Sequence, residues 1–281
     1  TLEFENVPVG PLAVIEAGKL APPARALEVA QDRLTEKRFV KEMGGRPADF
    51  APVDSPEDLL AAVERIGAPG ILKTRREGYD GKGQWRIESL REAEALNLPQ
   101  TGLIYEGLVR FSAEFSVILV RGHDGEVRFW DSPQNVHRSG ILATSPLPAP
   151  QAVVEQVPAA RELAARVAEA LGYVGVMTCE FFATDAGPVF NEMAPRVHNS
   201  GHWTIEGAET SQFENHIRAI CGLPLGETAT IAPGVEMENL IGSDVERAGE
   251  ILAEGSAHLH LYGKGEVRPG RKMGHVTRLT R

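Results

Sequence analysis

The chain is poor in cysteine and has no long hydrophobic run. Cys179 and Cys221 are the only cysteines among its 281 residues, and two thiols cannot build a disulfide framework. No apolar run is long enough to span a bilayer, and no basic segment followed by an apolar one opens the chain as in a signal peptide. These features predict a protein of the reducing cytoplasm that has no membrane partner.

Positive charge is also scarce, because 29 Lys and Arg face 39 Asp and Glu, which gives a formal net charge of −10. Nonspecific binding to nucleic acid needs a positive surface, so we expect no nucleic-acid partner. Small anionic substrates remain compatible with this charge, since cations can concentrate in one cleft of an acidic protein. The cations within residues 73–82 and 264–272 form two such concentrations.

Residues 71–84, ILKTRREGYDGKGQ, combine cations with three glycines. The flanking sequences at 70–74 and 83–87 predict two short strands, which places the glycines in a hairpin-like turn rather than between a strand and a helix. Backbone N–H groups and cations of such a turn can together neutralise a polyphosphate. On composition alone, a basic hairpin exposed to solvent accounts for the segment equally well.

The remaining pattern mixes helices and strands and predicts an α+β fold. A strand is expected at 1–8, helices at about 24–30, 32–45 and 56–66, and a hairpin within 113–131. An amphipathic helix at 160–171 precedes two paired strands at 174–184 and 187–195. A helix at 211–222 and an acidic helix near 244–254 follow.

Glu180 and Glu192 each lie within one of those two apolar strands. Regular alternation predicts that Glu192 shares one strand face with Phe190, and that Asn191 points to the opposite face. Two carboxylates on adjacent strands need protonation or a shared cation. Mg²⁺ fits, because it binds a few carboxylates together with phosphate oxygens, and a salt bridge to Arg196 is the alternative.

Residues 191–204, NEMAPRVHNSGHWT, are polar and have little helical or strand periodicity, which is typical of a binding segment that follows a strand. His198 and His202 have helix-like spacing for a metal, but Gly201 and the lack of a third ligand disfavour zinc. In the alternative interpretation, Asn199 and Ser200 cap the next segment and the histidines pack.

Residues 258–277 place four cations between glycines, namely Lys264, Arg268, Arg271 and Lys272. This arrangement suits a phosphomonoester. Without further context, a solvated basic edge is the stronger interpretation.

Taken together, these motifs resemble the ATP-grasp enzymes, and within them the 5-(carboxyamino)imidazole ribonucleotide synthetase family. LKTRR with GYDGKGQ, IYEGLV, QNVHRSGIL, RVHNSGHWT and the terminal cations occur in the family's order over nearly the whole chain. The resemblance implies an α+β ATP-grasp fold in which two α+β subdomains enclose ATP, followed by a small β-rich domain. The family's GGGQLGRM-type segment is not matched, so most of a Rossmann-like N-terminal domain is expected to be absent here.

The implied domains are a remnant of that N-terminal domain at 1–25, linking helices at 26–47, an ATP-grasp lid subdomain at 48–110, a core subdomain at 111–225 and the β-rich domain at 226–281.

The resemblance also implies the role of individual residues. The implied ATP-binding residues are Arg33, Lys73, Gly78, Tyr79, Asp80, Gly81, Lys82, Gly83, Gln84, Glu106, Gly107, Leu108, Val109, Glu114, His137, Asn191 and Glu192. Those implied to hold Mg²⁺ are Glu180 and Glu192, and those implied to bind the ribonucleotide are Asn199, Ser200, Lys264 and Arg271. The implied catalytic residues are Tyr79, Asp80, Lys82, Arg196 and His202.

The implied reaction joins bicarbonate to the amine of 5-aminoimidazole ribonucleotide at the expense of ATP, through carboxyphosphate, in a cytoplasmic homodimer. Lys82 occupies a position where many relatives carry Arg, which keeps the charge but loses bidentate geometry. Two alternatives are another ATP-grasp carboxylate–amine ligase and a fragment that binds ATP without catalysis.

Overall fold

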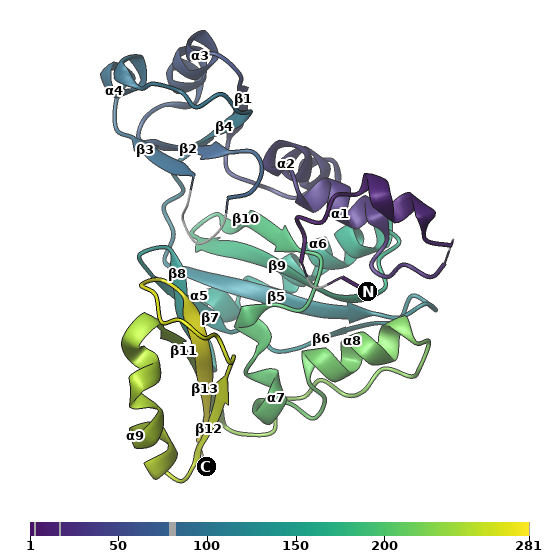
Figure 1. The fold of residues 1–281 in the computed structure, drawn as a ribbon. Coiled ribbons are helices and arrows are strands. Elements are labelled where there is room, and N and C mark those ends of the chain that lie inside the picture. The colour runs from purple at the N-terminus through teal and green to yellow at the C-terminus, as the bar shows by residue number, and fades with distance from the viewer. Residues whose placement is uncertain (3, 17, 79–82, 281) are drawn as a thin grey trace.

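The computed structural model describes residues 1–2, 4–16, 18–78 and 83–280, and its strands form two antiparallel sheets (Figure 1). The smaller sheet has the order β1-β4-β2-β3, and α3 and α4 cover it. Its elements are β1 Phe50–Val53, α3 Pro56–Ile66, β2 Gly70–Thr74, β3 Gln84–Ile87, α4 Leu90–Ala95 and β4 Leu103–Gly107. Ser55 and Ser89 cap the two helices, which fixes where each one begins.

The larger sheet has nine strands in the order β10-β9-β5-β7-β8-β11-β13-β12, with β6 paired to β5. Its strands are β5 Ala113–Arg121, β6 Val127–Phe129, β7 Gln134–Arg138, β8 Ile141–Leu147, β9 Gly175–Thr184, β10 Gly187–Ala194, β11 Gly234–Ile241, β12 Ala257–Leu261 and β13 Lys272–Thr280. Because β8 pairs with β11, the C-terminal strands continue the sheet begun by β5, β7 and β9.

Helices cover both faces of the larger sheet. They are α1 Ala24–Ala30, α2 Arg33–Glu42, α5 Gln151–Val154, α6 Val157–Ala170, α7 Thr204–Gly207, α8 Gln212–Ile220 and α9 Ala248–Ala253, with short 3-10 helices η1 Gly10–Val14, η2 Asn199–Gly201 and η3 Gly242–Arg247. Among the described residues, none of these helices is both long and apolar enough to cross a membrane.

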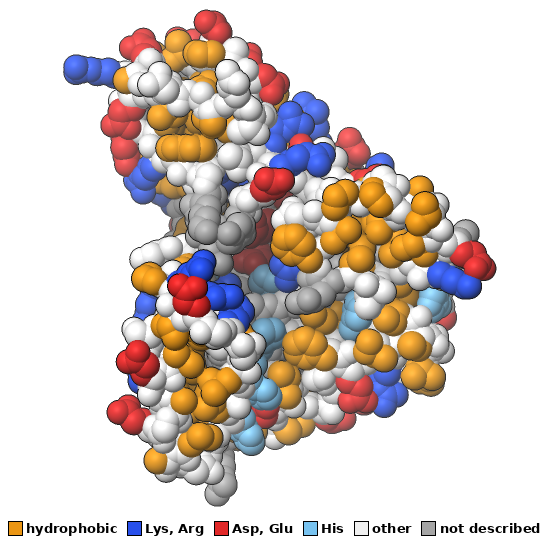
Figure 2. Space-filling model, viewed as in Figure 1, with side chains coloured by type: hydrophobic (Ala, Val, Ile, Leu, Met, Phe, Trp, Pro, Cys, Tyr) orange, Lys and Arg blue, Asp and Glu red, His pale blue; other side chains and the backbone are white. Residues whose placement is uncertain are grey.

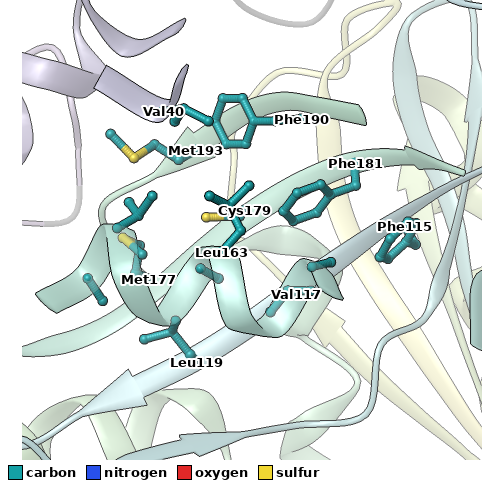
Figure 3. Packing of buried hydrophobic residues seen from close by; sticks show 14 of the residues in the cluster. Val40, Phe115, Val117, Leu119, Leu163, Met177, Cys179, Phe181, Phe190 and Met193 are labelled. Atoms are coloured by element: carbon teal, nitrogen blue, oxygen red, sulfur yellow. The ribbon is translucent and has the colours of Figure 1, made fainter. Parts of the chain in front are cut away.

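The main core lies between α1, α2 and α6 and one face of strands β5, β9 and β10. Figure 3 shows Val40 of α2 beside Phe190 of β10 and Leu163 of α6 beside Cys179 of β9, and all four are buried. A second core on the other face includes Trp203 and packs against α8. The larger sheet is therefore a rigid platform with apolar packing on both sides.

Most predicted elements are confirmed, including the strands on either side of the glycine-rich turn and the paired strands that carry Glu180 and Glu192. The prediction of a strand at 1–8 is wrong, because the described residues there form turns and irregular backbone. The acidic helix near 244–254 is divided into η3 and α9. Residues 135–138, NVHR, have the sequence of a plain loop when taken without the resemblance, but they belong to β7, which lies between two other strands.

A β-bulge in β10 overturns the prediction that Phe190 and Glu192 share a face. Phe190 pairs with Phe181 and Glu192 with Glu180, so Asn191 is the extra residue between them. The bulge sends Phe190 into the main core, where its ring meets Phe181 edge-on at 5.8 Å. Glu192 then faces Glu180 on the opposite side of the sheet, and the strand's strict alternation is lost at this point.

Gly70, at the start of β2, provides a test of the small sheet's packing. A Cβ at this position would collide with the Tyr105 hydroxyl and lie 2.8 Å from the carbonyl oxygen of Glu106. We expect Gly70→Ala to lower the free energy of unfolding by about 1–3 kcal/mol, measured by urea denaturation. Gly249→Ala in α9 is the matched control, because no atom lies within 4 Å of its added Cβ, and equal losses in both variants would contradict the packing argument.

Candidate active site

A cavity of about 530 Å³ opens where α2 and the small sheet meet the larger sheet. Side chains from α2, β2, β5, β7, β9, β10 and β13 line it, so it draws on segments spread over the whole chain. Figure 2 shows this face of the molecule hollowed below the small-sheet lobe, with acidic side chains visible in the depth. The site is therefore formed by tertiary contacts and not by one local motif.

Helix α2 presents three charged side chains at helical spacing toward this cavity and its walls. Asp32 caps the helix by accepting from the backbone N–H groups of Leu34 and Thr35. Arg33, Glu36 and Lys37 follow at spacings that put them on one face of the helix. Glu36 and Lys37 are almost completely buried, so each needs a partner.

A buried carboxylate, Glu106 of β4, joins α2 to the small sheet. Its Oε2 lies 2.9 Å from Lys73 Nζ of β2 and 3.3 Å from Lys37 Nζ of α2, and all three side chains are buried. Burial by itself would raise the pKa of Glu106, but the two ammonium groups lower it to about 2. Burial lowers the pKa of Lys73. Removal of Glu106 would leave two buried ammonium groups without their shared counter-charge.

The same face of α2 is tied to β10 of the larger sheet. Arg33 Nη1 donates to Glu192 Oε2 at 2.8 Å, and Lys37 Nζ donates to the Asn191 carbonyl at 2.9 Å. Glu36 Oε1 accepts from the Met193 N–H at 2.7 Å. Helix α2 lies beside β10 (Figure 1), and these three bonds hold both sides of the bulge, so α2 fixes the direction in which Glu192 points.

Because Glu36 is protonated, the charged side chains around α2 carry more positive than negative charge. Burial raises the pKa of Glu36 to about 8, with Lys37 opposing the rise and Glu192 adding to it, so this carboxyl is mostly neutral at pH 7. Although burial opposes ionisation of Glu192, Arg33 holds its pKa well below the usual range. The three cations Arg33, Lys37 and Lys73 therefore face two carboxylates, an arrangement that attracts an anion.

Glu180 and Glu192 occupy directly opposed positions on β9 and β10, and both line the cavity. Glu180 Oε1 lies 3.1 Å from His198 Nε2, while Glu192 pairs with Arg33. The Glu192 side chain is 41% exposed, and it lines the cavity. The Arg salt bridge weighed as the alternative is thus present with Arg33 rather than Arg196.

Arg196 instead pairs with Glu5, through Nη2 to Oε1 at 3.1 Å and through its Nε. Both residues line the cavity. Burial would raise the pKa of Glu5, but Arg196 lowers it. This pair ties the irregular N-terminal segment to the end of β10.

One wall of the cavity suits a nucleoside. Phe111 and Phe182 stack with ring centroids 4.6 Å apart, and Phe111 is 45% exposed. Glu114 Oε2 lies 3.2 Å from His137 Nδ1 beside them, and all four residues line the cavity. Burial opposes protonation of His137, but Glu114 raises its pKa. A flat aromatic surface next to a carboxylate can bind a base and accept from ribose hydroxyls.

The structure brings together many of the predicted site residues. Those that line the cavity are Arg33, Lys73, Gly78, Gln84, Glu114, His137, Glu180, Asn191, Glu192, Arg196 and Asn199. Those described but outside its lining are Gly83, Glu106, Gly107, Leu108, Val109, Ser200, His202, Lys264 and Arg271. Tyr79, Asp80, Gly81 and Lys82 lie outside the described residues. The bulge explains why Asn191 reaches the cavity, contrary to the regular alternation expected for it.

Residues 198–202 divide between the cavity and the protein interior. His198 caps η2 and reaches the cavity together with Asn199. Ser200 is buried and its Oγ donates to Ser116 Oγ at 2.9 Å. His202 packs against Phe213, with ring centroids 5.5 Å apart. The alternative of capping and packing thus describes the contacts of Ser200 and His202 in this structure.

Among the C-terminal cations, Lys272 is the one that lines the cavity among the described residues. Lys264 Nζ donates to the Lys272 carbonyl at 2.7 Å, and Arg271 Nη1 donates to the Glu266 carbonyl at 3.0 Å. These bonds keep the loop between β12 and β13 folded beside the cavity. Sequence reasoning grouped Lys272 with the other cations but did not assign it to the site.

Sequence reasoning also missed Glu36, Lys37, Phe111 and Phe182. In the sequence RLTEKRFVKE the charges resemble a solvated helix face, and the spacing of residues 33, 36 and 37 is the one signal that they share a face. Phe111 and Phe182 are far apart in the chain, and nothing local indicates that their rings meet.

A family model for the ATP-grasp domain matches residues 38–213, and one for the phosphoribosylaminoimidazole carboxylase C-terminal domain matches residues 236–281. The fold is thus that of an ATP-grasp protein.

Similar proteins show to which family of ATP-grasp proteins the chain belongs. The N5-carboxyaminoimidazole ribonucleotide synthases of Brucella melitensis and Pseudomonas aeruginosa are 51% and 46% identical, over 99% of this chain and 78% and 76% of theirs. The Thermus thermophilus synthetase structure has a TM-score of 0.89 and 52% identity, over 99% of this chain and 76% of that one.

An Aspergillus clavatus synthase structure, in complex with ADP and 5-aminoimidazole ribonucleotide, has a TM-score of 0.88 at 30% identity, over 99% of this chain and 76% of that one. The chain belongs to the N5-carboxyaminoimidazole ribonucleotide synthase family of ATP-grasp ligases. This confirms the family and fold class predicted from the sequence motifs.

The neutral Glu36 predicts a pH dependence of stability. Its pKa is about 8 in the folded chain against an ordinary value of 4.5, so between these values the unfolded chain binds fewer protons and stability falls as pH rises. Glu36→Gln carries no such proton. We expect its unfolding free energy, relative to the parent, to rise from pH 5 to pH 8 by on the order of a few kcal/mol in urea titrations.

Glu42→Gln, at an exposed position on the same helix, is the control and should show no such rise. Parallel pH profiles for Glu36→Gln and the parent protein would show that Glu36 is ionised in the folded state.

Proposed function

We propose that this chain uses ATP to carboxylate 5-aminoimidazole ribonucleotide with bicarbonate, giving N5-carboxyaminoimidazole ribonucleotide, ADP and phosphate. The observation that carries the proposal is one cavity that combines a cationic cluster, two facing carboxylates and an aromatic wall, in a chain of this family. Each of these parts suits a different portion of the reactants.

In the proposed reaction, a bicarbonate oxygen attacks the γ-phosphorus of ATP, and the bond to the β,γ-bridging oxygen breaks to release ADP. The product is carboxyphosphate. The exocyclic amine then attacks its carboxyl carbon, or CO₂ released from it, the new C–N bond forms, and inorganic phosphate and a proton leave. The net reaction balances as ATP, bicarbonate and the amine giving ADP, phosphate and the carboxyamine.

The chain's residues are proposed to position charge rather than to form covalent intermediates. Arg33 and Lys73 are proposed to bind the phosphates, because carboxylates hold both side chains at the cavity, Glu192 for Arg33 and Glu106 for Lys73, and they need no reorganisation when an anion arrives. The Glu114 carboxylate would accept from the ribose, and Phe111 and Phe182 would contact the base. Exclusion of water matters here because carboxyphosphate hydrolyses readily.

Glu180 and Glu192 are proposed to hold Mg²⁺. The donor set fits, since two carboxylates on directly opposed strand positions line the cavity, and hard oxygen ligands are those that Mg²⁺ prefers. When bound, Mg²⁺ would neutralise charge on the phosphate oxygens. Arg33 and His198 also pair with these carboxylates.

The ribonucleotide is proposed to bind near Asn199 and Lys272, both of which line the cavity. Lys264 and Arg271 lie on the adjoining loop and are proposed to contact its phosphate. Tyr79, Asp80, Lys82, Arg196 and His202 keep their proposed catalytic roles. The predicted domain boundaries, the homodimer and the cytoplasmic location likewise stay proposals.

Glu192→Ala tests the metal assignment. The variant loses one of two proposed Mg²⁺ ligands, so we expect ATP turnover to fall at least about 10²-fold, measured as ADP release with 5-aminoimidazole ribonucleotide and bicarbonate. Nucleotide binding should survive, because Arg33 and Lys73 remain. The control is Glu250→Ala, at an exposed position on α9. Turnover at the parent rate in Glu192→Ala would refute the assignment.

The acceptor is tested by measuring ADP release with a panel of amines. We expect stimulation by 5-aminoimidazole ribonucleotide alone, and formation of its N-carboxylated product. Stimulation by another amine would favour a different ATP-grasp ligase. Tight ATP binding with no product from any amine would favour a chain that binds nucleotide without catalysis.

A further inference from the structure

A second group of metal-ligating side chains lies outside the cavity lining, between α7 and the C-terminal strands. Glu206 belongs to α7, while His260 of β12 and His275 of β13 are directly opposed across the sheet. One donor atom from each residue lies within 4.8 Å of the others. His260 Nε2 lies 2.6 Å from Glu206 Oε1, and the two imidazole rings stack with centroids 4.5 Å apart. Figure 2 shows histidine side chains gathered on this face.

A chain of hydrogen bonds fixes the protonation of the neighbouring histidine. Asn239 Nδ2 donates to the Leu142 carbonyl at 2.9 Å, which orients the Asn239 amide. Its second N–H donates to Asn199 Oδ1 at 2.7 Å, which orients Asn199 in turn. The Asn199 Nδ2 group therefore donates to Asn239 Oδ1 at 2.9 Å and to His202 Nδ1 at 3.2 Å. His202 Nδ1 is thus an acceptor.

The Tyr262 hydroxyl lies between His202 and His275, so the protonation of His202 Nδ1 determines that of His275 Nδ1. It lies 3.0 Å from His202 Nδ1 and 2.8 Å from His275 Nδ1. His202 Nδ1 carries no proton in this arrangement, so the hydroxyl proton points to it, and the single lone pair of that nitrogen accepts both this bond and the longer one from Asn199 Nδ2. The hydroxyl oxygen must then accept from His275 Nδ1–H, so in the neutral His275 ring the lone pair is on Nε2.

That lone pair has no hydrogen-bond partner among the described residues, although the His275 side chain is only 2% exposed. Glu206 Oε2 is also buried and has no hydrogen-bond partner there. Two acceptors without donors, one of them anionic, are costly to bury unless a positive group lies between them. Burial, reinforced by His260, lowers the pKa of His275 to about 4, so its ring is neutral at pH 7.

We propose that Glu206, His260 and His275 form a binding site for a divalent transition-metal ion, for which Zn²⁺ is the reference. Two imidazole nitrogens and one carboxylate are a common zinc donor set that leaves the fourth position open. Tyr262 takes the part of the outer hydrogen-bond partner that orients a ligating histidine. His260, whose side chain is 36% exposed, is the ligand that moves inward to reach tetrahedral spacing.

This site would bear on the cavity through the same hydrogen bonds. A metal on His275 Nε2 holds the proton on Nδ1, and the chain through Tyr262 and His202 then orients Asn199, which lines the cavity. The inference concerns residues other than the two carboxylates assigned to Mg²⁺. The zinc titration below therefore tests this inference separately from the proposed reaction.

The test is calorimetric titration of the chelator-treated protein with zinc chloride. We expect one site per chain that involves these residues, and at least about tenfold weaker binding in His260→Asn and in His275→Asn. Tyr262→Phe removes the outer partner and should weaken binding by about 10-fold or more. Binding of Co²⁺ should give the visible absorption of a four-coordinate ion, and the two histidine variants should lose it.

His258→Asn is the matched control, because His258 is an exposed histidine on the same strand and does not belong to the group. Glu192→Ala controls for zinc at the Glu180–Glu192 pair and should retain the site. Circular dichroism and ATP binding check the folding of each variant, and His260, which is only partly buried, gives the histidine variant whose folding is less at risk. Absence of zinc binding, or binding unchanged in His260→Asn, would overturn the proposal.

Discussion

The Glu106 carboxylate, buried between Lys37 and Lys73, is the interaction on which the rest of the site depends. It joins three elements that are distant in the chain, namely β4, β2 and α2. A buried charge tolerates little movement, because a charge left without any counter-charge costs several kcal/mol. Once α2 is fixed against the small sheet, its other charged side chains, Arg33 and Glu36, fix β10 of the larger sheet. The position of one helix therefore decides how the two sheets meet.

The bulge at Asn191 converts this connection into a functional geometry. Without the extra residue, β10 could not send Phe190 into the core and Glu192 to the cavity opposite Glu180. Lys37 and Glu36 bind the backbone of residues 191 and 193, on either side of Glu192. The same contacts therefore place the Glu192 carboxylate and leave the site with excess positive charge. The charge is positive because Glu36 is mostly neutral, so the cations outnumber the carboxylates.

Much of the fold could be predicted from the sequence, because its elements are locally consistent. The spacing of Ala160, Leu163 and Val167 marks α6, and the glycine-rich turn between two apolar runs marks β2 and β3. Glu180 and Glu192 stand out because carboxylates are rare in apolar strands. The local pattern failed where tertiary contacts decide: the first residues form no strand, and Arg196 pairs with Glu5 rather than Glu192.

The sequence by itself determined the family, the order of most elements and the chemical groups of the site, because those depend on residue type and short-range spacing. Only the tertiary structure decided which groups meet. It assigned Arg33 to Glu192 and Lys37 to Glu106, brought Lys272 to the cavity, and set Glu206 beside His260 and His275. The reason is physical: a charged side chain looks the same in a sequence whether water or protein surrounds it, and only packing establishes which of the two it is.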